Sequence, residues 1–214
     1  MKEFFSIEGP FMQFFAKLWD MIILSILFCV CCIPIVTFGV SYSALYYTMV
    51  KAVIPGEGHT IRTFFKGLRQ NIKQGLGLGI LFEAILVVLF FSLYVVFIND
   101  LGLLGRFFGI AFVISLILVM TLMAYAFPLA GRFHNSIGEI LANSLLIAVG
   151  SWKETVSMFI LEAVLLASMA FVLFVPFIVL FVPGVVVWMQ AKMLEVLLIP
   201  YMREGGEDNE TETV

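Results

Sequence analysis

Two carboxylates stand alone inside long apolar stretches of the sequence. Glu83 is the only charged residue between Gln74 and Asn99, and Glu162 is the only one between Thr155 and Ala191. A charged side chain near the centre of a bilayer costs about 2.5–3.5 kcal/mol or more, so residues of this kind mark functional sites by default. One interpretation is that both carboxylates face a shared cavity and hold a proton or a cation there.

A structural interpretation of the same residues stays open. Each glutamate lies several residues inside its predicted helix, roughly 9–12 Å below the same membrane surface at about 1.5 Å per residue. At that depth Arg132, Lys153 or a nearby hydroxyl group could neutralise the carboxylate, or the side chain could extend to water. The predicted intramembrane polar site therefore consists of Glu83, Glu162 and Arg132.

Other arrangements that carry chemistry are missing from the sequence. It contains no H-E-x-x-H, G-x-x-x-x-G-K-[ST] or G-x-S-x-G motif. Its three cysteines, Cys29, Cys31 and Cys32, lie in one apolar run without a second pair or a nearby histidine, which favours packing over metal binding or redox chemistry. The sequence predicts no catalytic residue, no cofactor and no metal, and therefore a protein that is not an enzyme.

Composition places these residues in a membrane. Of the 214 residues 62% are hydrophobic and 13% are charged, and the mean hydropathy is +1.10. Soluble domains are about 45–50% apolar and about 25% charged, so the composition excludes a soluble globular protein, a disordered chain and a nucleic-acid-binding protein.

The apolar runs predict an all-α fold, a polytopic transmembrane helix bundle of about five spans with amphipathic interfacial helices. The expected spans cover roughly residues 19–38, 75–98 and 107–130, a stretch from about 156, and one ending near 198. Pro176, Pro183 and Gly184 lie where the chain could bend or turn between the last two, and four spans remain an alternative. Residues 1–203 form a single transmembrane domain in this interpretation, and residues 204–214 form an acidic, disordered tail.

Two shorter segments do not fit a crossing. Residues 40–54 carry three tyrosines, which are typical of the headgroup level, and predict an interfacial or re-entrant helix. Residues 59–73 alternate apolar and basic positions at helical spacing. This second segment predicts a lipid-binding or partner-binding surface formed by Arg62, Lys66, Arg69 and Lys73.

Small residues begin two of the predicted spans. Gly75, Gly77 and Gly79 lie at the start of the second span, and Gly105 and Gly109 at the start of the third. Small side chains allow helix backbones to approach closely. We expect these glycines to pack within one chain, with dimerisation as the alternative.

Lysine and arginine positions predict an orientation, because cytoplasmic loops carry the excess of these residues. With five spans the twelve residues divide nine to three, and with four spans they divide seven to five. The five-span division places the N-terminus outside and the C-terminus in the cytoplasm.

Several ordered motifs resemble the YesL family. They are CIPIVTFG at 32–39, ALYYTMVK at 44–51, FFKGLRQNIKQG at 64–75 and FPLAGRFHNS at 127–136. The resemblance extends over about residues 4–203 and implies a bacterial integral membrane protein without an established activity. Genes of this family often lie beside carbohydrate uptake and degradation systems. The family has no established catalytic or binding residues that could be transferred to this chain.

Residues and resemblance together predict a non-enzymatic accessory or scaffold protein of the bacterial plasma membrane. Its expected partners are the lipid bilayer and a carbohydrate transporter complex, with no nucleic acid. The alternative is a small carrier or channel that uses Glu83 and Glu162 in an intramembrane cavity.

Overall fold

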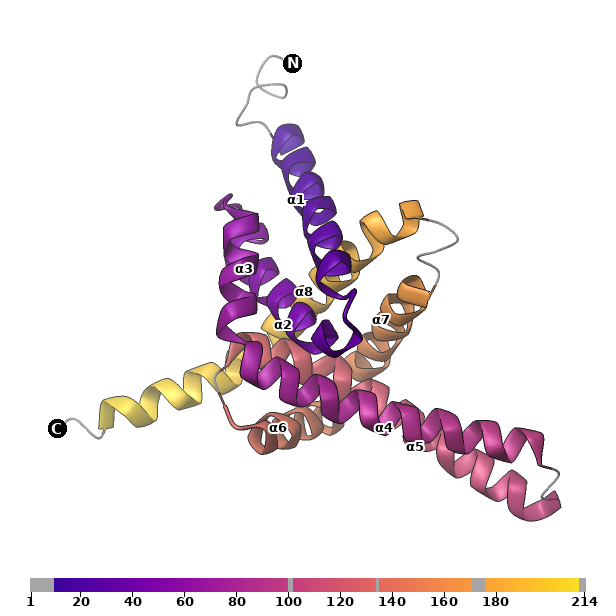
Figure 1. Ribbon diagram of the computed structural model, residues 1–214. Helices are drawn as coiled ribbons and strands as arrows, with labels where there is room; N and C mark the ends of the chain where they lie inside the picture. Colours follow the sequence, from indigo (N-terminus) through magenta and orange to yellow (C-terminus); the bar gives the residue numbers. More distant parts are fainter. Residues whose placement is uncertain (1–9, 100–101, 134, 171–175, 212–214) are drawn as a thin grey trace.

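Helices make up all the regular structure in the described part of the chain (Figure 1). The computed structural model describes residues 10–99, 102–133, 135–170 and 176–211. The α-helices are α1 Pro10–Cys31, α2 Phe38–Thr48, α3 Thr60–Gln70, α4 Ile72–Ile98, α5 Gly102–Arg132, α6 Ile137–Gly150, α7 Trp152–Ala170 and α8 Pro176–Thr211. A 3₁₀ turn, η1 Ile35–Thr37, precedes α2, and a π-helical turn, η2 Met49–Val53, follows it. The predicted all-α class is confirmed.

Four helices are long and apolar enough to cross a membrane. They are α1 from Phe14, α4, α5 and α8 over Phe181–Ile199. Helices α6 and α7 meet this condition only as a pair, and the pair is bent by 116°. The described chain therefore has four candidate spans, or five if the bent pair counts as one, in agreement with the predicted number.

The first apolar run is shorter than predicted. Its helix ends at Cys31 and not near residue 38, because Pro34 follows and cannot continue the backbone hydrogen bonding of a helix. The Thr37 hydroxyl donates to the carbonyl oxygens of Cys31 and of Pro34, the latter at 2.6 Å. The chain reverses direction here into α2.

Helix α2 occupies the centre of the molecule, where other helices surround it. It packs against α3, α4 and α5, and Tyr42 and Tyr46 are completely buried. The predicted contact of these two tyrosines with headgroups is therefore wrong, because protein surrounds them, and the depth of residues 40–54 in the membrane stays a prediction. The re-entrant alternative fits the path of the chain better, since Lys17 near the start of α1 donates to the carbonyl oxygen of Ile54 at 3.2 Å.

Glycines allow α2 to lie directly against its neighbours. A Cβ atom on Gly75 would lie 2.6 Å from Cα of Val40, and one on Gly131 would lie 2.5 Å from the carbonyl oxygen of Ser43. Gly79 also faces the backbone of Gly39 at the start of α2. The expected packing of Gly75 and Gly79 within one chain is confirmed, and at these glycines the backbones of α4 and α5 approach α2 directly.

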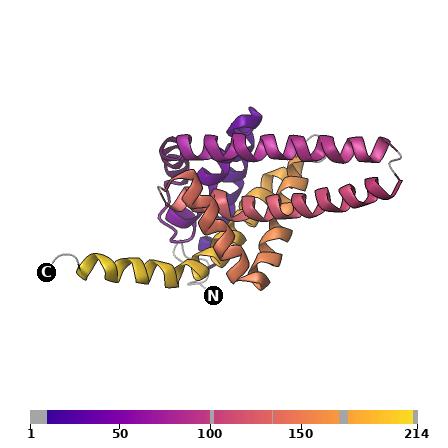
Figure 2. The same cartoon turned by 90° about the horizontal axis from the view of Figure 1, so that it is seen from below.

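Helices α4 and α5 form a long antiparallel hairpin that projects from the rest of the molecule (Figures 1 and 2). With 27 and 31 residues, the helices measure about 40 and 46 Å at 1.5 Å per residue, more than the hydrocarbon thickness of about 30 Å. Large apolar side chains such as Phe91, Phe97 and Phe107 are exposed along the hairpin. An apolar surface of this extent is typical of contact with lipid chains.

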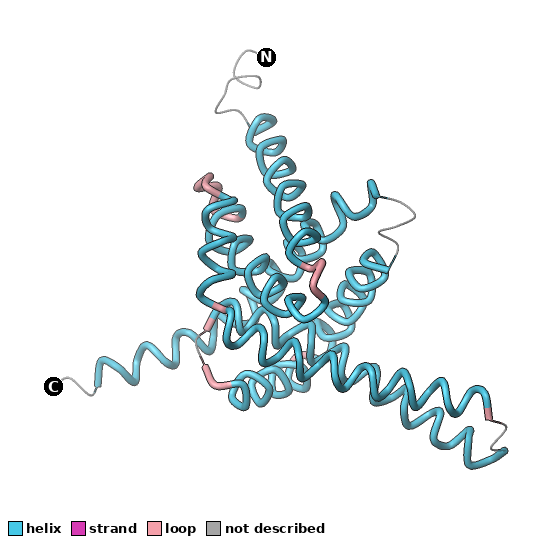
Figure 3. The backbone as a smooth tube through the Cα atoms, viewed as in Figure 1, coloured by secondary structure: helices cyan, strands magenta, loops and turns pink. Residues whose placement is uncertain are grey.

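Helix α8 continues through two of the three positions predicted for a bend, Pro183 and Gly184 (Figure 3). Pro176 begins the helix, where its missing N–H has no intrahelical role, but Pro183 and Gly184 lie inside the helix. Gly184 donates its N–H to the Ser25 hydroxyl of α1 at 2.9 Å, so a backbone group next to the proline has a partner. Of the three predicted positions, Pro176 does mark the start of a new helix, whereas the chain does not turn at Pro183 or Gly184. The helix also overlaps the predicted acidic tail up to Thr211, while residues 212–214 lie outside the described residues; the disorder of the tail stays a prediction.

Replacing Gly75 by alanine tests the backbone contact between α4 and α2. The added methyl group would overlap Val40, so we expect Gly75→Ala to destabilise the fold by about 1–3 kcal/mol, the usual cost of overpacking. Gly138→Ala is the matched control, because nothing lies within 4 Å of its added methyl group and alanine favours a helix by up to about 1 kcal/mol. Thermal unfolding in detergent measures both, and equal stability of the two variants would contradict the contact.

Candidate functional site

A buried polar group joins α2, α7 and α8 through Glu162. Its Oε2 atom lies 2.6 Å from the Tyr42 hydroxyl and accepts a hydrogen bond from Nε2 of Gln190 at 3.2 Å. The Tyr42 hydroxyl also lies 2.7 Å from Oε1 of Gln190, so the three side chains contact one another in a triangle. All three are completely buried. We call Tyr42, Glu162 and Gln190 the inner polar group.

The inner polar group has more acceptors than donors. The single proton of Tyr42 can be donated to Glu162 or to Gln190, but not to both at once. Oε1 of Glu162 is buried and has no hydrogen-bond partner. Buried acceptors without donors are costly, so the arrangement has the capacity to bind one further proton.

A second polar group lies about one turn further along α2 and α8. Glu195 of α8 accepts a hydrogen bond from the Tyr46 hydroxyl at 3.0 Å and forms an ion pair with Arg132 at 3.2 Å. About a fifth to a quarter of the Arg132 and Glu195 side chains is exposed. We call Tyr46, Arg132 and Glu195 the outer polar group. Tyr42 and Tyr46 are four residues apart and therefore lie on one face of α2, which aligns the two groups along the contact between α2 and α8.

Aromatic rings enclose the inner polar group on the side facing α1 and α5. The Tyr42 ring lies 5.3 Å from the ring of Phe127, 5.9 Å from Phe38 and 6.5 Å from Phe28. Phe127 contacts Phe82 of α4 at 5.6 Å. These rings exclude water from the inner polar group, and the low dielectric they create strengthens its hydrogen bonds.

Glu83 lies on a helix that carries none of the residues of the two polar groups. It belongs to α4, which packs mainly on α5 and α2, whereas α7 with Glu162 packs mainly on α8 and α5. Glu83 is partly exposed, and its Oε1 atom is buried without a hydrogen-bond partner. Of the three predicted site residues, Glu162 contacts Tyr42 of α2 directly, and Arg132 is connected to Tyr46 of α2 through Glu195. A shared site with Glu83 stays a prediction.

Helix α3 presents three distinct faces. Phe64 is completely buried, and Gly67 packs against the ring of Tyr47. Ile61 and Phe65 are about half exposed. The remaining face and the start of α4 carry the four predicted basic residues, all exposed: Arg62, Lys66, Arg69 and Lys73. The first three of these residues, together with Phe65, line an open surface groove of about 740 Å³. We call Ile61, Phe65 and the four basic residues the basic surface.

Sequence reasoning missed Tyr42 and Gln190 as partners of Glu162. The tyrosines of α2 had been assigned to the headgroup level, and Gln190 lies in an apolar run without any recognisable spacing to Glu162. A glutamine in such a run was the available signal, because a buried amide in a membrane helix requires a polar partner. The described residues hold no group of three His, Cys, Asp or Glu side chains able to bind a metal.

The apolar candidate spans and the enclosed polar groups define a helical, multi-pass type of membrane protein. Within the chain, residues 21–93 match a family described as "Protein of unknown function, DUF624". The match extends from α1 to α4 and covers less than half of the chain, including both tyrosines and the basic surface but not Glu162. Neither a curated protein nor a solved structure gives a match.

Removing one hydroxyl tests the inner polar group. Tyr42→Phe keeps the aromatic contacts but removes the donor to Oε1 of Gln190 and leaves Oε2 of Glu162 with Nε2 of Gln190 alone. We therefore expect a loss of about 1–3 kcal/mol in stability. Tyr94→Phe is the matched control, because Tyr94 is 63% exposed and surface substitutions change stability by about 0.5 kcal/mol at most. Thermal unfolding of both variants in detergent gives the comparison. A Tyr42→Phe protein as stable as the control would mean that the hydroxyl stabilises nothing.

Proposed function

We propose that the chain is a non-enzymatic accessory or scaffold protein of the bacterial plasma membrane. The observation that supports this function best is the basic surface on α3, which is exposed although its helix is anchored in the core through Phe64. The inner polar group supports the same conclusion, because it is enclosed by packed helices and connects three of them. A scaffold needs a stable body with an accessible contact surface, and this chain has both features.

Anionic lipid is the ligand that the basic surface fits. Ile61 and Phe65 are exposed beside Arg62, Lys66 and Arg69. Apolar side chains of such a helix enter the boundary between headgroups and acyl chains, while its cations attract anionic headgroups with about 1 kcal/mol each. The groove between these residues offers room for a headgroup.

We further propose that the basic surface and the C-terminus face the cytoplasm. Gln74 at the start of α4 donates to the carbonyl oxygen of Asn135, so the start of α4 and the segment after α5 lie together. The ion pair between Arg132 and Glu195 brings α8 to the same end of α5. This arrangement places most of the basic residues on one side of the membrane, which agrees with the preference of lysine and arginine for cytoplasmic segments.

The partner class that we propose is a carbohydrate transporter complex. Support comes from the YesL resemblance and from the matched family DUF624, to which YesL belongs. The exposed apolar hairpin of α4 and α5 offers a surface inside the membrane on which transporter helices could pack.

A small carrier is the second candidate function, supported by the surplus of acceptors in the inner polar group. A carboxylate that can bind one proton in a membrane protein is a common element of proton-coupled transport. The carrier would use Glu162 and Glu83, although these residues lie on helices with different principal neighbours.

Neutralising the basic surface tests the accessory function. We expect added phosphatidylglycerol to raise the melting temperature of the full-length protein in mild detergent more than phosphatidylcholine does. This difference should largely disappear when Arg62, Lys66, Arg69 and Lys73 are all replaced by glutamine, because each lost cation removes about 1 kcal/mol of attraction. Arg106→Gln, an exposed cation near the tip of the hairpin, is the control and should keep the difference. If the fourfold variant responds to phosphatidylglycerol like the wild type, lipid binding by this surface is refuted.

Copurification and proton flux separate the two functions. A scaffold purified in mild detergent should bring transporter subunits with it and should carry no proton flux when reconstituted alone. A carrier should acidify vesicles by itself, and Glu162→Gln should abolish that flux because the amide keeps the shape but cannot exchange a proton. Proton flux in the wild type that is lost in Glu162→Gln would overturn the scaffold in favour of the carrier.

A further inference from the structure

Helices α1 and α3 lie side by side over the second half of α1. At one end the Thr60 hydroxyl donates to Asp20 at 2.8 Å. At the other end Val30 and Cys31 of α1 line a groove of about 300 Å³ together with Leu68 of α3 and Ile72 at the start of α4. Residues 20–31 of α1 and residues 60–72 therefore run in the same direction and occupy the same levels. Figure 1 shows the two helices next to each other.

This alignment fixes the depth of α1 relative to the basic residues. Arg62, Lys66 and Arg69 are exposed along the length of α3 that accompanies α1. If α1 crossed the bilayer, these three cations would be distributed through the hydrocarbon, at a cost of about 2.5–3.5 kcal/mol for each one near the centre. Placing α3 at the membrane surface avoids this cost, and the contacts between the helices then hold α1 at the surface as well.

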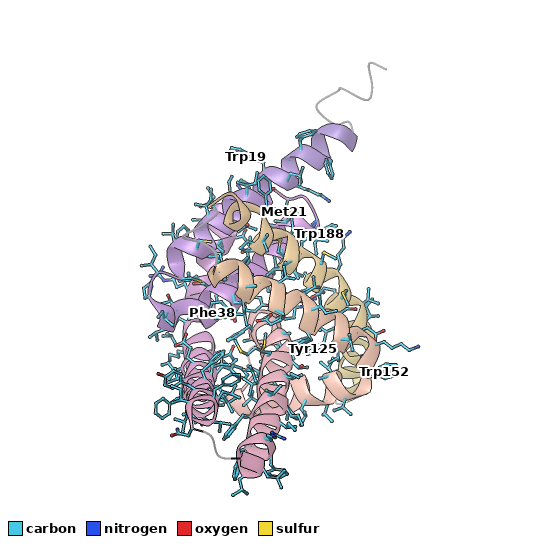
Figure 4. All side chains as sticks on the ribbon, turned by 90° about the vertical axis from the view of Figure 1, so that its right-hand side faces the viewer. Trp19, Met21, Phe38, Tyr125, Trp152 and Trp188 are labelled. Atoms are coloured by element: carbon cyan, nitrogen blue, oxygen red, sulfur yellow. The ribbon has the colours of Figure 1, made fainter. Side chains whose placement is uncertain are left out.

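The exposed side of α1 suits such a position. Phe15, Trp19, Ile26 and Val30 form an exposed apolar stripe along one side of α1. Trp19 is 64% exposed and lies on the outside of the helix (Figure 4). Tryptophan prefers the membrane interface, and length does not separate interfacial helices from crossing ones, since many interfacial helices have 20–30 residues.

We propose that α1 does not cross the membrane but lies in the interface beside α3, so that the two helices form one lipid-facing layer. This layer binds the anionic headgroups of the membrane in which α4 and α5 are embedded. The start of α1 then shares the cytoplasmic side with the basic surface, in place of the outside position expected from charge counting over five spans. The cytoplasmic side and the negative charge of the bound lipid rest on the proposed function. The depth of α1 in the membrane does not.

Depth-dependent quenching of tryptophan fluorescence tests the position of α1. The full-length protein carries three tryptophans, and replacing Trp152 and Trp188 by phenylalanine leaves Trp19 as the only one. The protein is reconstituted in vesicles of phosphatidylglycerol and phosphatidylcholine that contain lipids brominated either near the carboxyl end or near the methyl end of the acyl chain. A second protein carries its single tryptophan at position 26 through Trp19→Phe and Ile26→Trp.

The two placements predict opposite quenching patterns. If Phe14–Cys31 crossed the bilayer, residues 19 and 26 would lie on either side of its middle, each within about 6 Å of the bilayer centre at 1.5 Å per residue. Bromines near the methyl end would then quench both tryptophans more strongly. In an interfacial helix, bromines near the carboxyl end quench both more strongly, and this is the result that we expect. Val88→Trp in a background without the other tryptophans is the control, because it lies exposed near the middle of α4 and should show the deep pattern.

The outcomes separate this proposal from the proposed function. Stronger quenching of Trp19 by the deep bromines, with the same result for Val88→Trp, would overturn the interfacial position of α1. Trp19 is a native residue on the exposed side, so this arm does not depend on the folding of an α1 variant. A shallow Trp19 in vesicles of phosphatidylcholine alone, combined with no preference of the protein for phosphatidylglycerol, would support the position of α1 and refute anionic lipid binding by the basic surface.

Discussion

The burial of α2 is the constraint on which the rest of the structure depends. In a helix surrounded by other helices a polar side chain without a partner is costly, because no water is available to it. Tyr42 and Tyr46 meet this requirement through α7 and α8, and Ser43 and Thr48 donate to carbonyl oxygens one turn earlier in α2 itself. The opposite requirement applies on the sides of α4 and α5, where glycines take the place of side chains. The neighbours of α2 therefore carry glycines where its backbone approaches α4 and α5, and polar residues where its tyrosines meet α7 and α8.

The sequence predicts the class of the fold well because span length and hydropathy are local properties. The break after Cys31 and the amphipathic character of α3 follow from Pro34 and from the spacing of charges, and neither depends on long-range contacts. The burial of α2 could not be predicted in this way. Its tyrosines are compatible with a headgroup position and with a buried polar contact, and only the placement of Glu162 and Gln190, more than a hundred residues later, decides between them.

The candidate site shows the same division. A carboxylate inside an apolar run is visible in the sequence, so Glu162 and Glu83 were both identified. Their partners are not visible, because hydrogen bonds between helices depend on rotation about each helix axis. Lys192 and Glu195 illustrate this point: three residues apart, they could form a pair on α8. Instead Lys192 lies 4.0 Å from the ring centre of Trp188, and Glu195 binds Arg132 of α5.

The position of both tyrosines on one face of α2 has a mechanical consequence. A rotation of α2 about its axis by one residue, about 100°, would remove Tyr42 from Glu162 and Tyr46 from Glu195 together. Sliding α2 along its axis would move Val40 and Ser43 away from Gly75 and Gly131, toward neighbouring residues of α4 and α5 that carry side chains. Movement of α2 alone would therefore disturb its polar contacts with α7 and α8 and its close backbone contacts with α4 and α5 together.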